Sequence, residues 1–346
     1  AARARASASR TALASASGTI GAISAAAQGP VTTAASPRDV EAHPRLDVVY
    51  TANADAASIG VYSFDPVDLS LAPIGEHALS AGARPIALAL TPSGRHMYAL
   101  SETGVVHGMG VDGLSGAPST TGGITVQGAM LDGKLRADRL GRFLFVVQPA
   151  AGRVTSLTVN LPAGFLLISN FDTSLPRPID LWASPDGRFA YVLDEELARV
   201  FPYSIDRVSG SLVSLGAGLS LGGAPTRLLS ASAADTILSQ SPAEELLALD
   251  GPLARWQGLW RDPINGLLPS QPAPEVYELP AEVVEFARLS SAVSPTSFNL
   301  LAIDGPGGAR LVSGYDTPGP SAEWIEISSL PLGAGPHALA TRVRMR

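Results

Sequence analysis

Few residues of this chain could perform acid–base chemistry. General acid–base catalysis needs groups that change protonation near neutral pH, and histidine does so most often. The chain has five histidines: His43, His77, His96, His107 and His337. No pair of them has a metal-ligand spacing such as His-x-x-x-His, so the sequence predicts no metal site. We expect structural roles for them, with His337 as the single candidate for a catalytic position.

Four polar residues are candidates for binding a small acid. Arg84, Asp180, Arg227 and His337 lie on or beside segments that we expect to face a central channel. The alternative is that these arginines and aspartates are solvated or pair with each other. The chain has no Gly-x-Ser-x-Gly, no P-loop and no dinucleotide fingerprint, so no cofactor is predicted.

Two interleaved patterns would position these residues. The first, Pro-x-x-Leu, begins at Pro85, Pro178, Pro225 and Pro336. The second, Asp/Asn-x-x-x-Gly, begins at Asp112, Asn160, Asp206 and Asp262. The intervals cluster near 47 residues, as between Gly94 and Gly141. A fixed period of this size is typical of propellers and other repeat arrays.

One repeat, residues 178–223, shows the expected unit. It contains four β-rich runs separated by turn residues: Ile179–Ser184, Phe189–Leu193, Arg199–Ile205 and Ser211–Leu215. A four-stranded meander of this length is one propeller blade, so the predicted fold is an all-β propeller of four-stranded blades. The aspartates of the second pattern are interpreted as Asx turns rather than calcium ligands, because each turn offers too few oxygens.

The two ends of the repeat region predict how the ring closes. Residues 45–50 match a second strand with no first strand before it, and residues 336–340 match a first strand with nothing after it. We therefore expect residues 336–346 and 45–80 to form a composite blade, which would remove the open sheet edges. The count is six blades, or seven if residues 224–335 contain a further unit.

The residues before the repeats are predicted to form an extended arm. Residues 1–43 are assigned to the arm and residues 44–346 to the propeller; the arm is rich in Ala and Ser. Ile20 and Ile23 could anchor it along the sheet edge of a neighbouring subunit. The alternative is a flexible linker or the remnant of a targeting segment, which the start at Ala1 also fits.

Composition excludes several classes of function. The net charge is −7 and there is no basic block, which argues against nucleic-acid binding. No stretch approaches the roughly 18 apolar residues of a membrane helix. Cysteine is absent, which removes disulfides and thiolate chemistry. We expect a bacterial protein that is exported to the periplasm, the cell surface or the medium rather than kept in the cytoplasm.

Residues 177–212 resemble a blade of the 6-phosphogluconolactonase-like propellers, also called lactonase-type propellers. Pro185–Glu195 is similar to that family's Pro-x-Gly-Lys-Tyr-x-Tyr-Val-x-Asn-Glu run, and Tyr203–Leu212 to its Tyr-x-x-Asp-x-x-x-Gly-x-Leu ending. The resemblance spans residues 45–223 and returns at 335–339. It implies a site in the central channel, where the family's first strands carry Arg and His beside a lactone carboxylate.

This chain departs from the family at those positions. The matching residues are Ile86, Ala87, Ile179, Asp180, Thr226, Arg227, His337 and Ala338. Only Glu102 and Glu195 match the family's acidic position after the second strand. The resemblance therefore implies that the scaffold is kept while most of the catalytic residues have changed.

The sequence favours a non-catalytic β-propeller that is a structural or interaction subunit of a larger, extracellular assembly. Its partners would be protein subunits of a homo- or hetero-oligomer, contacted through the arm. The alternative is a lactonase- or isomerase-like enzyme that acts on a small acid or sugar lactone with His337, Arg227 and Glu195.

Overall fold

The computed structural model describes most of the chain between residues 33 and 331. The described ranges are 33–65, 70–128, 130–161, 163–223, 225–230, 245–250, 255–262, 264–268, 275–278, 283–289, 297–304, 308–315 and 324–331. Over these ranges the strands form six antiparallel sheets, each built on a meander of four strands in chain order, and one of them has a short fifth strand.

The first three sheets lie between residues 37 and 174. The first contains β1 (Pro37–Ala42), β2 (Val48–Asn53), β3 (Ser58–Phe64) and β4 (Leu71–Ala78). The second contains β5 (Pro85–Leu90), β6 (His96–Ser101), β7 (Val105–Val111) and β8 (Pro118–Thr125). The third contains β9 (Lys134–Ala137), β10 (Phe143–Gln148), β11 (Arg153–Asn160) and β12 (Phe165–Ser174), with the 3-10 turn η1 (Pro149–Ala151) between β10 and β11.

The other three sheets follow in the same order. The fourth contains β13 (Pro178–Ala183), β14 (Phe189–Asp194), β15 (Arg199–Ile205) and β16 (Leu212–Ser214), with the short β17 (Leu219–Ser220) also paired to β15. The fifth contains β18 (Arg227–Ser230), β19 (Glu245–Asp250), β20 (Arg255–Trp260) and β21 (Glu275–Glu278). The sixth contains β22 (Val283–Leu289), β23 (Ser297–Asp304), β24 (Gly308–Tyr315) and β25 (Trp324–Pro331).

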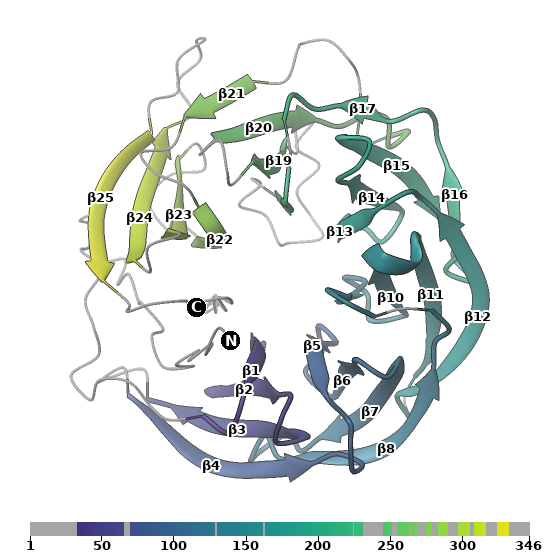
Figure 1. The fold of residues 1–346 in the computed structure, drawn as a ribbon, viewed down its shortest axis with the longest axis vertical. Coiled ribbons are helices and arrows are strands. Elements are labelled where there is room, and N and C mark those ends of the chain that lie inside the picture. Colours follow the sequence, from purple (N-terminus) through teal and green to yellow (C-terminus); the bar gives the residue numbers. More distant parts are fainter. Residues whose placement is uncertain are drawn as a thin grey trace.

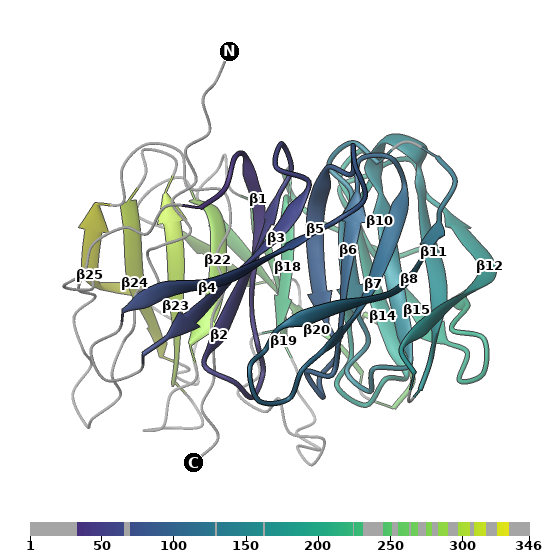
Figure 2. The same ribbon diagram turned by 90° about the horizontal axis from the view of Figure 1, so that it is seen from below.

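The sheets are arranged around a common centre like blades. Figure 1 shows first strands such as β1, β5 and β13 toward the centre and fourth strands such as β4, β12 and β25 at the rim. Figure 2 shows the ring from its edge, with inner strands such as β1 and β5 running roughly along its short axis. The predicted all-β propeller of four-stranded blades is confirmed. Among the described residues, no helix is long and apolar enough to cross a membrane.

The second strands form the buried layer of the first four blades. Every residue of β2, β6, β10 and β14 is buried. This is because both faces of these strands pack against neighbouring sheets, which also explains why their sequences are mostly apolar rather than alternating, with a polar residue at the last position of each. The outer strand β8 has only exposed and half-buried residues, because it lies at the rim of the ring.

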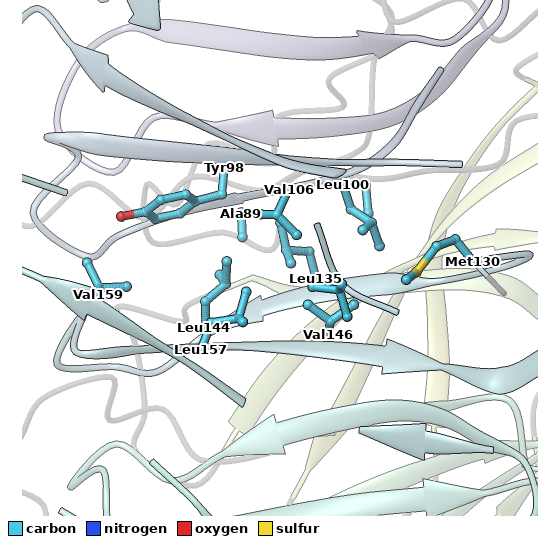
Figure 3. Close-up of a cluster of buried hydrophobic side chains, with 12 residues drawn as sticks. Ala89, Tyr98, Leu100, Val106, Met130, Leu135, Leu144, Val146, Leu157 and Val159 are labelled. Carbon is cyan, nitrogen blue, oxygen red and sulfur yellow. The ribbon is translucent and has the colours of Figure 1, made fainter. Parts of the chain in front are cut away.

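The core consists of apolar layers between adjacent sheets. Figure 3 shows one of them, in which Tyr98, Leu100 and Val106 of the second sheet meet Leu144 and Leu157 of the third. Burial of each such side chain contributes about 1.5–3 kcal/mol, so these layers hold neighbouring blades together.

The Asp/Asn-x-x-x-Gly pattern builds the turn between the third and fourth strands, and the Asx-turn interpretation is confirmed. Asp206 Oδ1 accepts hydrogen bonds from the amides of Val208 and Ser209 at 3.1 and 2.8 Å. The Gly210 amide closes the turn by donating to the Asp206 carbonyl oxygen at 2.9 Å. Gly210 has a φ of 75°, a left-handed conformation that favours glycine.

The same glycine also touches the preceding blade, which the repeat pattern alone did not reveal. A Cβ on Gly210 would lie 2.5 Å from the ring of Phe143 in the third sheet. In the second and third sheets, the Tyr98 hydroxyl donates to the Gly164 carbonyl oxygen at 2.9 Å. Each of these turns is therefore a contact between two blades as well as a link between two strands.

The predicted composite blade is wrong. The first strand of the first sheet is β1, which comes from residues 37–42 and pairs with β2 in register. The repeat pattern places these residues in the arm, whereas the propeller begins at Pro37. The segment has the same form as Pro178–Leu181, but Val40 stands where the repeat has leucine, so it does not match the pattern.

Several residues that the sequence singles out lie outside the described residues. They are Ile20, Ile23 and residues 336–346, including His337. The described parts of residues 224–335 supply the fifth and sixth sheets.

Candidate functional site

Charged residues gather at one position of the first strands. In every sheet, one residue of the first strand pairs with the next-to-last residue of the second strand, and in some sheets a β-bulge sets this register. The residues at this position are Asp39, Ala87, Lys134, Asp180, Arg227 and Glu285, in chain order. Figure 1 shows first strands such as β1, β5 and β13 around the centre of the ring, so the charged residues at this position belong to strands from different blades that surround that centre.

Two more charged residues extend the group along the strands. Glu41 lies two residues beyond Asp39 in β1, and Arg136 lies two residues beyond Lys134 in β9. Residues two apart in a strand share a face. We call Asp39, Glu41, Lys134, Arg136, Asp180 and Arg227 the central cluster. It combines three cations with three carboxyl groups, while β5 between β1 and β9 contributes only Ala87 and Ala89 on that face.

Asp180 is the most enclosed member of the central cluster, with a side chain only 1% exposed. Arg136 Nη2 donates to its Oδ1 at 2.9 Å, and Arg227 Nε and Lys134 Nζ lie 3.6 and 3.9 Å from its Oδ2. Burial alone would raise the pKa of Asp180, but the three cations and the amide of Leu228 together hold it well below its usual range. Asp180 is therefore ionised at neutral pH and joins three blades.

Asp39 makes the same backbone contacts in the first blade. Its Oδ1 accepts from the Val40 amide at 2.9 Å, and its Oδ2 accepts from the Leu88 amide of the next blade at 2.7 Å. Asp180 likewise accepts from its own neighbour Leu181 and from Leu228 of the next blade, each at 3.0 Å. Both aspartates therefore fasten one first strand to the next. The leucine of the Pro-x-x-Leu pattern supplies the amide in each case.

The two carboxyl groups of β1 have raised pKa values, in contrast to the lowered pKa of Asp180. Burial raises the pKa of Asp39, and only partial compensation comes from its backbone bonds and from Arg136 and Arg227. Burial and the neighbouring charge of Asp39 raise the pKa of Glu41 to about 8. Glu41 thus keeps its proton at pH 7, so within the described cluster the cations outnumber the carboxylates.

Of the predicted site residues that the structure describes, it brings two together. Asp180 and Arg227 meet in the central cluster. Arg84 instead pairs with Asp55 and with Glu102, and its Nε lies 2.7 Å from Glu102 Oε2. Glu195 pairs with Arg177. These pairs are partly exposed and lie beyond the strand ends rather than in the central cluster.

The four described histidines have structural partners. His43 Nε2 lies 3.0 Å from the Gly94 carbonyl oxygen, and His107 Nε2 lies 2.9 Å from Ser101 Oγ. His77 bonds Thr120 on the outer strands, and His96 is buried against the Gly164 turn. Burial lowers the pKa of His107. None of these four histidines belongs to the central cluster.

Sequence reasoning missed Asp39, Glu41, Lys134 and Arg136. A signal for the first two exists, because Pro37-Arg-Asp-Val-Glu-Ala42 matches Pro178-Ile-Asp-Leu-Trp-Ala183 at proline, aspartate, the aliphatic residue and alanine. Lys134 and Arg136 carry no comparable signal, because the first strand of the third sheet, β9, has no proline. In the described part of the chain, no group of three or more His, Asp or Glu side chains is arranged to hold a metal ion.

Comparison with known proteins rests on shape alone. No family model matches the chain, and no curated protein matches its sequence. Among solved structures, a putative 6-phosphogluconolactonase from Bacteroides fragilis has a TM-score of 0.70 at 15% identity, covering 92% of this chain and 89% of the other. The periplasmic gluconolactonase PpgL from Pseudomonas aeruginosa has a TM-score of 0.67 at 18% identity, covering 92% and 91%.

The chain has the fold of the lactonase-type β-propellers. The same fold also occurs in the hydrazine synthase structure of Kuenenia stuttgartiensis, with a TM-score of 0.60 at 13% identity over 89% of this chain and 90% of the other. Because one fold serves proteins with such different names, the function has to be argued from the central cluster.

Proposed function

We propose that this lactonase-type propeller is a non-catalytic binding module that holds a small carboxylate at the centre of its ring. The observation that carries the proposal is the convergence of Lys134, Arg136 and Arg227 around the single carboxylate of Asp180. The side chains of these three cations are about a quarter exposed, at 26, 28 and 26%. A small carboxylate could therefore reach them without first breaking the core.

Arginine is well suited to this role. Its planar guanidinium can donate two parallel hydrogen bonds to one carboxylate, and it stays charged at any physiological pH. Arg136 and Arg227 come from β9 and β18, on either side of β13. A ligand that bridges them would add to the contacts that Asp180 already makes with both.

Two observations support a binding rather than a catalytic role. The described histidines are occupied outside the central cluster, and the acidic position after the second strand, Glu195, is tied to Arg177. The Asp180 carboxylate, with its low pKa, is a poor proton acceptor at neutral pH.

A second candidate function, lactone hydrolysis, is favoured by one specific group. Burial and the charge of Asp39 raise the pKa of Glu41 to about 8, which is in the range that suits a general acid or base. An enzyme of this chain would therefore depend on Glu41 rather than on Glu195.

One experiment separates the two functions. Gluconate binding is measured by calorimetry, and hydrolysis of glucono-δ-lactone is followed in a pH-stat, for the wild type, Arg227→Ala and Arg84→Ala. We expect gluconate to bind the wild type and Arg84→Ala equally, and Arg227→Ala at least about tenfold more weakly, since a charge-assisted bond is worth roughly 1.5–3 kcal/mol. Arg84→Ala is the matched control because Arg84 is paired outside the cluster.

The outcomes are distinct. If gluconate fails to bind the wild type, or Arg227→Ala binds it normally, the central site is not the binding site. If the wild type hydrolyses the lactone faster than buffer and Glu41→Gln abolishes this, the protein is an enzyme and the non-catalytic proposal fails.

The role as a subunit of a larger assembly remains part of the proposal. Residues 1–32 precede the described chain, so deleting them leaves β1 intact. We expect this deletion to reduce the particle size measured by light scattering, if the arm contacts a neighbouring subunit. An unchanged particle size would remove the arm from the proposal. We also propose export, which the periplasmic location of PpgL supports; a signal in the periplasmic fraction of the native host would test it.

A further inference from the structure

The Asp180 side chain is held in the way that a protein holds a bound carboxylate. Both of its oxygens accept a backbone hydrogen bond, one from the next residue and one from the next blade, each at 3.0 Å. Arg136 Nη2 lies 2.9 Å from its Oδ1, and Arg227 Nε and Lys134 Nζ lie 3.6 and 3.9 Å from its Oδ2. One carboxylate therefore takes up two backbone donors and three cations from three different strands.

Asp39 shows that an aspartate at this position of the first strand does not need the cations. It accepts the same two backbone hydrogen bonds, from Val40 at 2.9 Å and from Leu88 of the next blade at 2.7 Å. Within the described part of the chain, no arginine or lysine nitrogen lies within 4 Å of the Asp39 carboxylate. Joining two first strands is therefore not the reason that three cations surround Asp180.

The cations differ from the carboxylate in their access to solvent. The side chain of Asp180 is 1% exposed, whereas those of Lys134, Arg136 and Arg227 are 26, 28 and 26% exposed. A carboxylate that enters from the solvent can therefore contact the cations, and it would have to share their positive charge with Asp180.

We propose, building on the proposed function, that Asp180 is an internal carboxylate that competes with an external one for Arg136, Arg227 and Lys134. It thereby sets the affinity of the ring centre for its ligand. Removing the charge of Asp180 leaves the cations without their buried counter-charge, which destabilises the fold. The same change should strengthen the binding of an external carboxylate, because the charge-assisted hydrogen bonds of the arginines then serve that ligand.

The first test supplies the missing carboxylate from solution. Asp180→Ala lacks the carboxylate group alone, and formate has the size and charge of that group. We expect sodium formate to raise the melting temperature of Asp180→Ala in a saturable way and by more than sodium chloride at the same concentration. This is because an anion that binds only the folded state stabilises it by mass action. The wild type should respond to the two salts alike.

Asp39→Ala is the matched control for the formate test. It also removes a buried carboxylate that accepts two backbone hydrogen bonds, but one without a cation within 4 Å in the described part of the chain. Formate should therefore stabilise Asp39→Ala no more than chloride does.

The second test uses Asp180→Asn, which keeps the shape of the side chain and serves if the alanine variant fails to fold. Calorimetry should show that Asp180→Asn binds gluconate at least about tenfold more tightly than the wild type, since hydrogen bonds to charged groups are the strong ones. Gluconate should also raise the melting temperature of this variant by more than that of the wild type.

The inference and the proposed function fail separately. If gluconate binds the wild type, and Asp180→Asn equally or more weakly, the function stands and the inference is refuted. If gluconate binds Asp180→Asn but not the wild type, the inference stands and the proposed function fails. If formate stabilises Asp180→Ala no more than chloride does, or stabilises Asp39→Ala equally, the cations do not form a carboxylate site and the inference is refuted.

Discussion

Replacing Glu41 with glutamine should change how the stability of the fold depends on pH. The pKa of Glu41 is raised from 4.5 in the unfolded chain to about 8 in the folded protein. Between these values the folded state holds a proton that the unfolded state has released. Stability is therefore greatest below pH 4.5 with respect to this group, and it falls as the pH rises toward 8.

The loss of folding stability is set by the pH interval between the unfolded-state and folded-state pKa values of Glu41. Each pH unit costs about 1.36 kcal/mol, so the full interval from 4.5 to about 8 corresponds to roughly 5 kcal/mol. Glu41 is only half-buried by exposed area. Solvent screening reduces the figure, and we expect about 2–3 kcal/mol.

Urea unfolding at pH 5, 7 and 9, followed by fluorescence of the four tryptophans, measures this difference. The wild type should lose about 2–3 kcal/mol between pH 5 and 9, and Glu41→Gln should lose markedly less. Arg84→Ala provides a control whose pH dependence should match that of the wild type. If Glu41→Gln and the wild type lose the same stability, Glu41 does not hold a proton in the folded state and our electrostatic argument is wrong.

Three further substitutions test the contacts between blades by the same unfolding measurement. Gly210→Ala should destabilise the protein by about 2–4 kcal/mol, because the new Cβ would overlap the Phe143 ring and the φ of this residue is positive. Gly113→Ala is the control and should have little effect, because no atom lies within 4 Å of the position of its Cβ. Equal effects of the two substitutions would contradict the packing argument. Tyr98→Phe should cost about 1–3 kcal/mol, because it leaves a turn carbonyl without its donor, and a loss below 0.5 kcal/mol would count against this hydrogen bond. Asp180→Asn should cost about 3–5 kcal/mol by leaving three cations without their shared buried partner, and a neutral result would mean that the cluster does not brace the ring.

The sequence specified the blades because their determinants are local. An Asx-turn aspartate, a glycine with positive φ and a run of β-branched and aromatic residues act within a few positions of each other. They recur at a fixed period, so the turn at Asp206–Gly210 could be assigned from residue types alone. The same approach failed for β1 because a single change, Val40 for leucine, removed the marker.

The candidate site could be predicted only in part. Asp180 and Arg227 were found because they sit beside a repeated proline. Lys134 and Arg136 were not, since the third blade has no such proline and nothing in the local sequence marks a residue that faces the centre. Arg84 and Glu195 lie outside the cluster and pair with Asp55 and Arg177, which could not be foreseen because those partners are distant in sequence or separated by a full hairpin.

The sequence alone determined the all-β class, the four-stranded repeat and the chemistry of its turns, because these depend on neighbours along the chain. Only the tertiary structure decided which segment fills the first sheet and how each carboxyl group behaves. Asp39 and Asp180 occupy the same position of the repeat and make the same backbone bonds. Their pKa values move in opposite directions because electrostatic energy sums over charges that different blades bring to the centre of the ring.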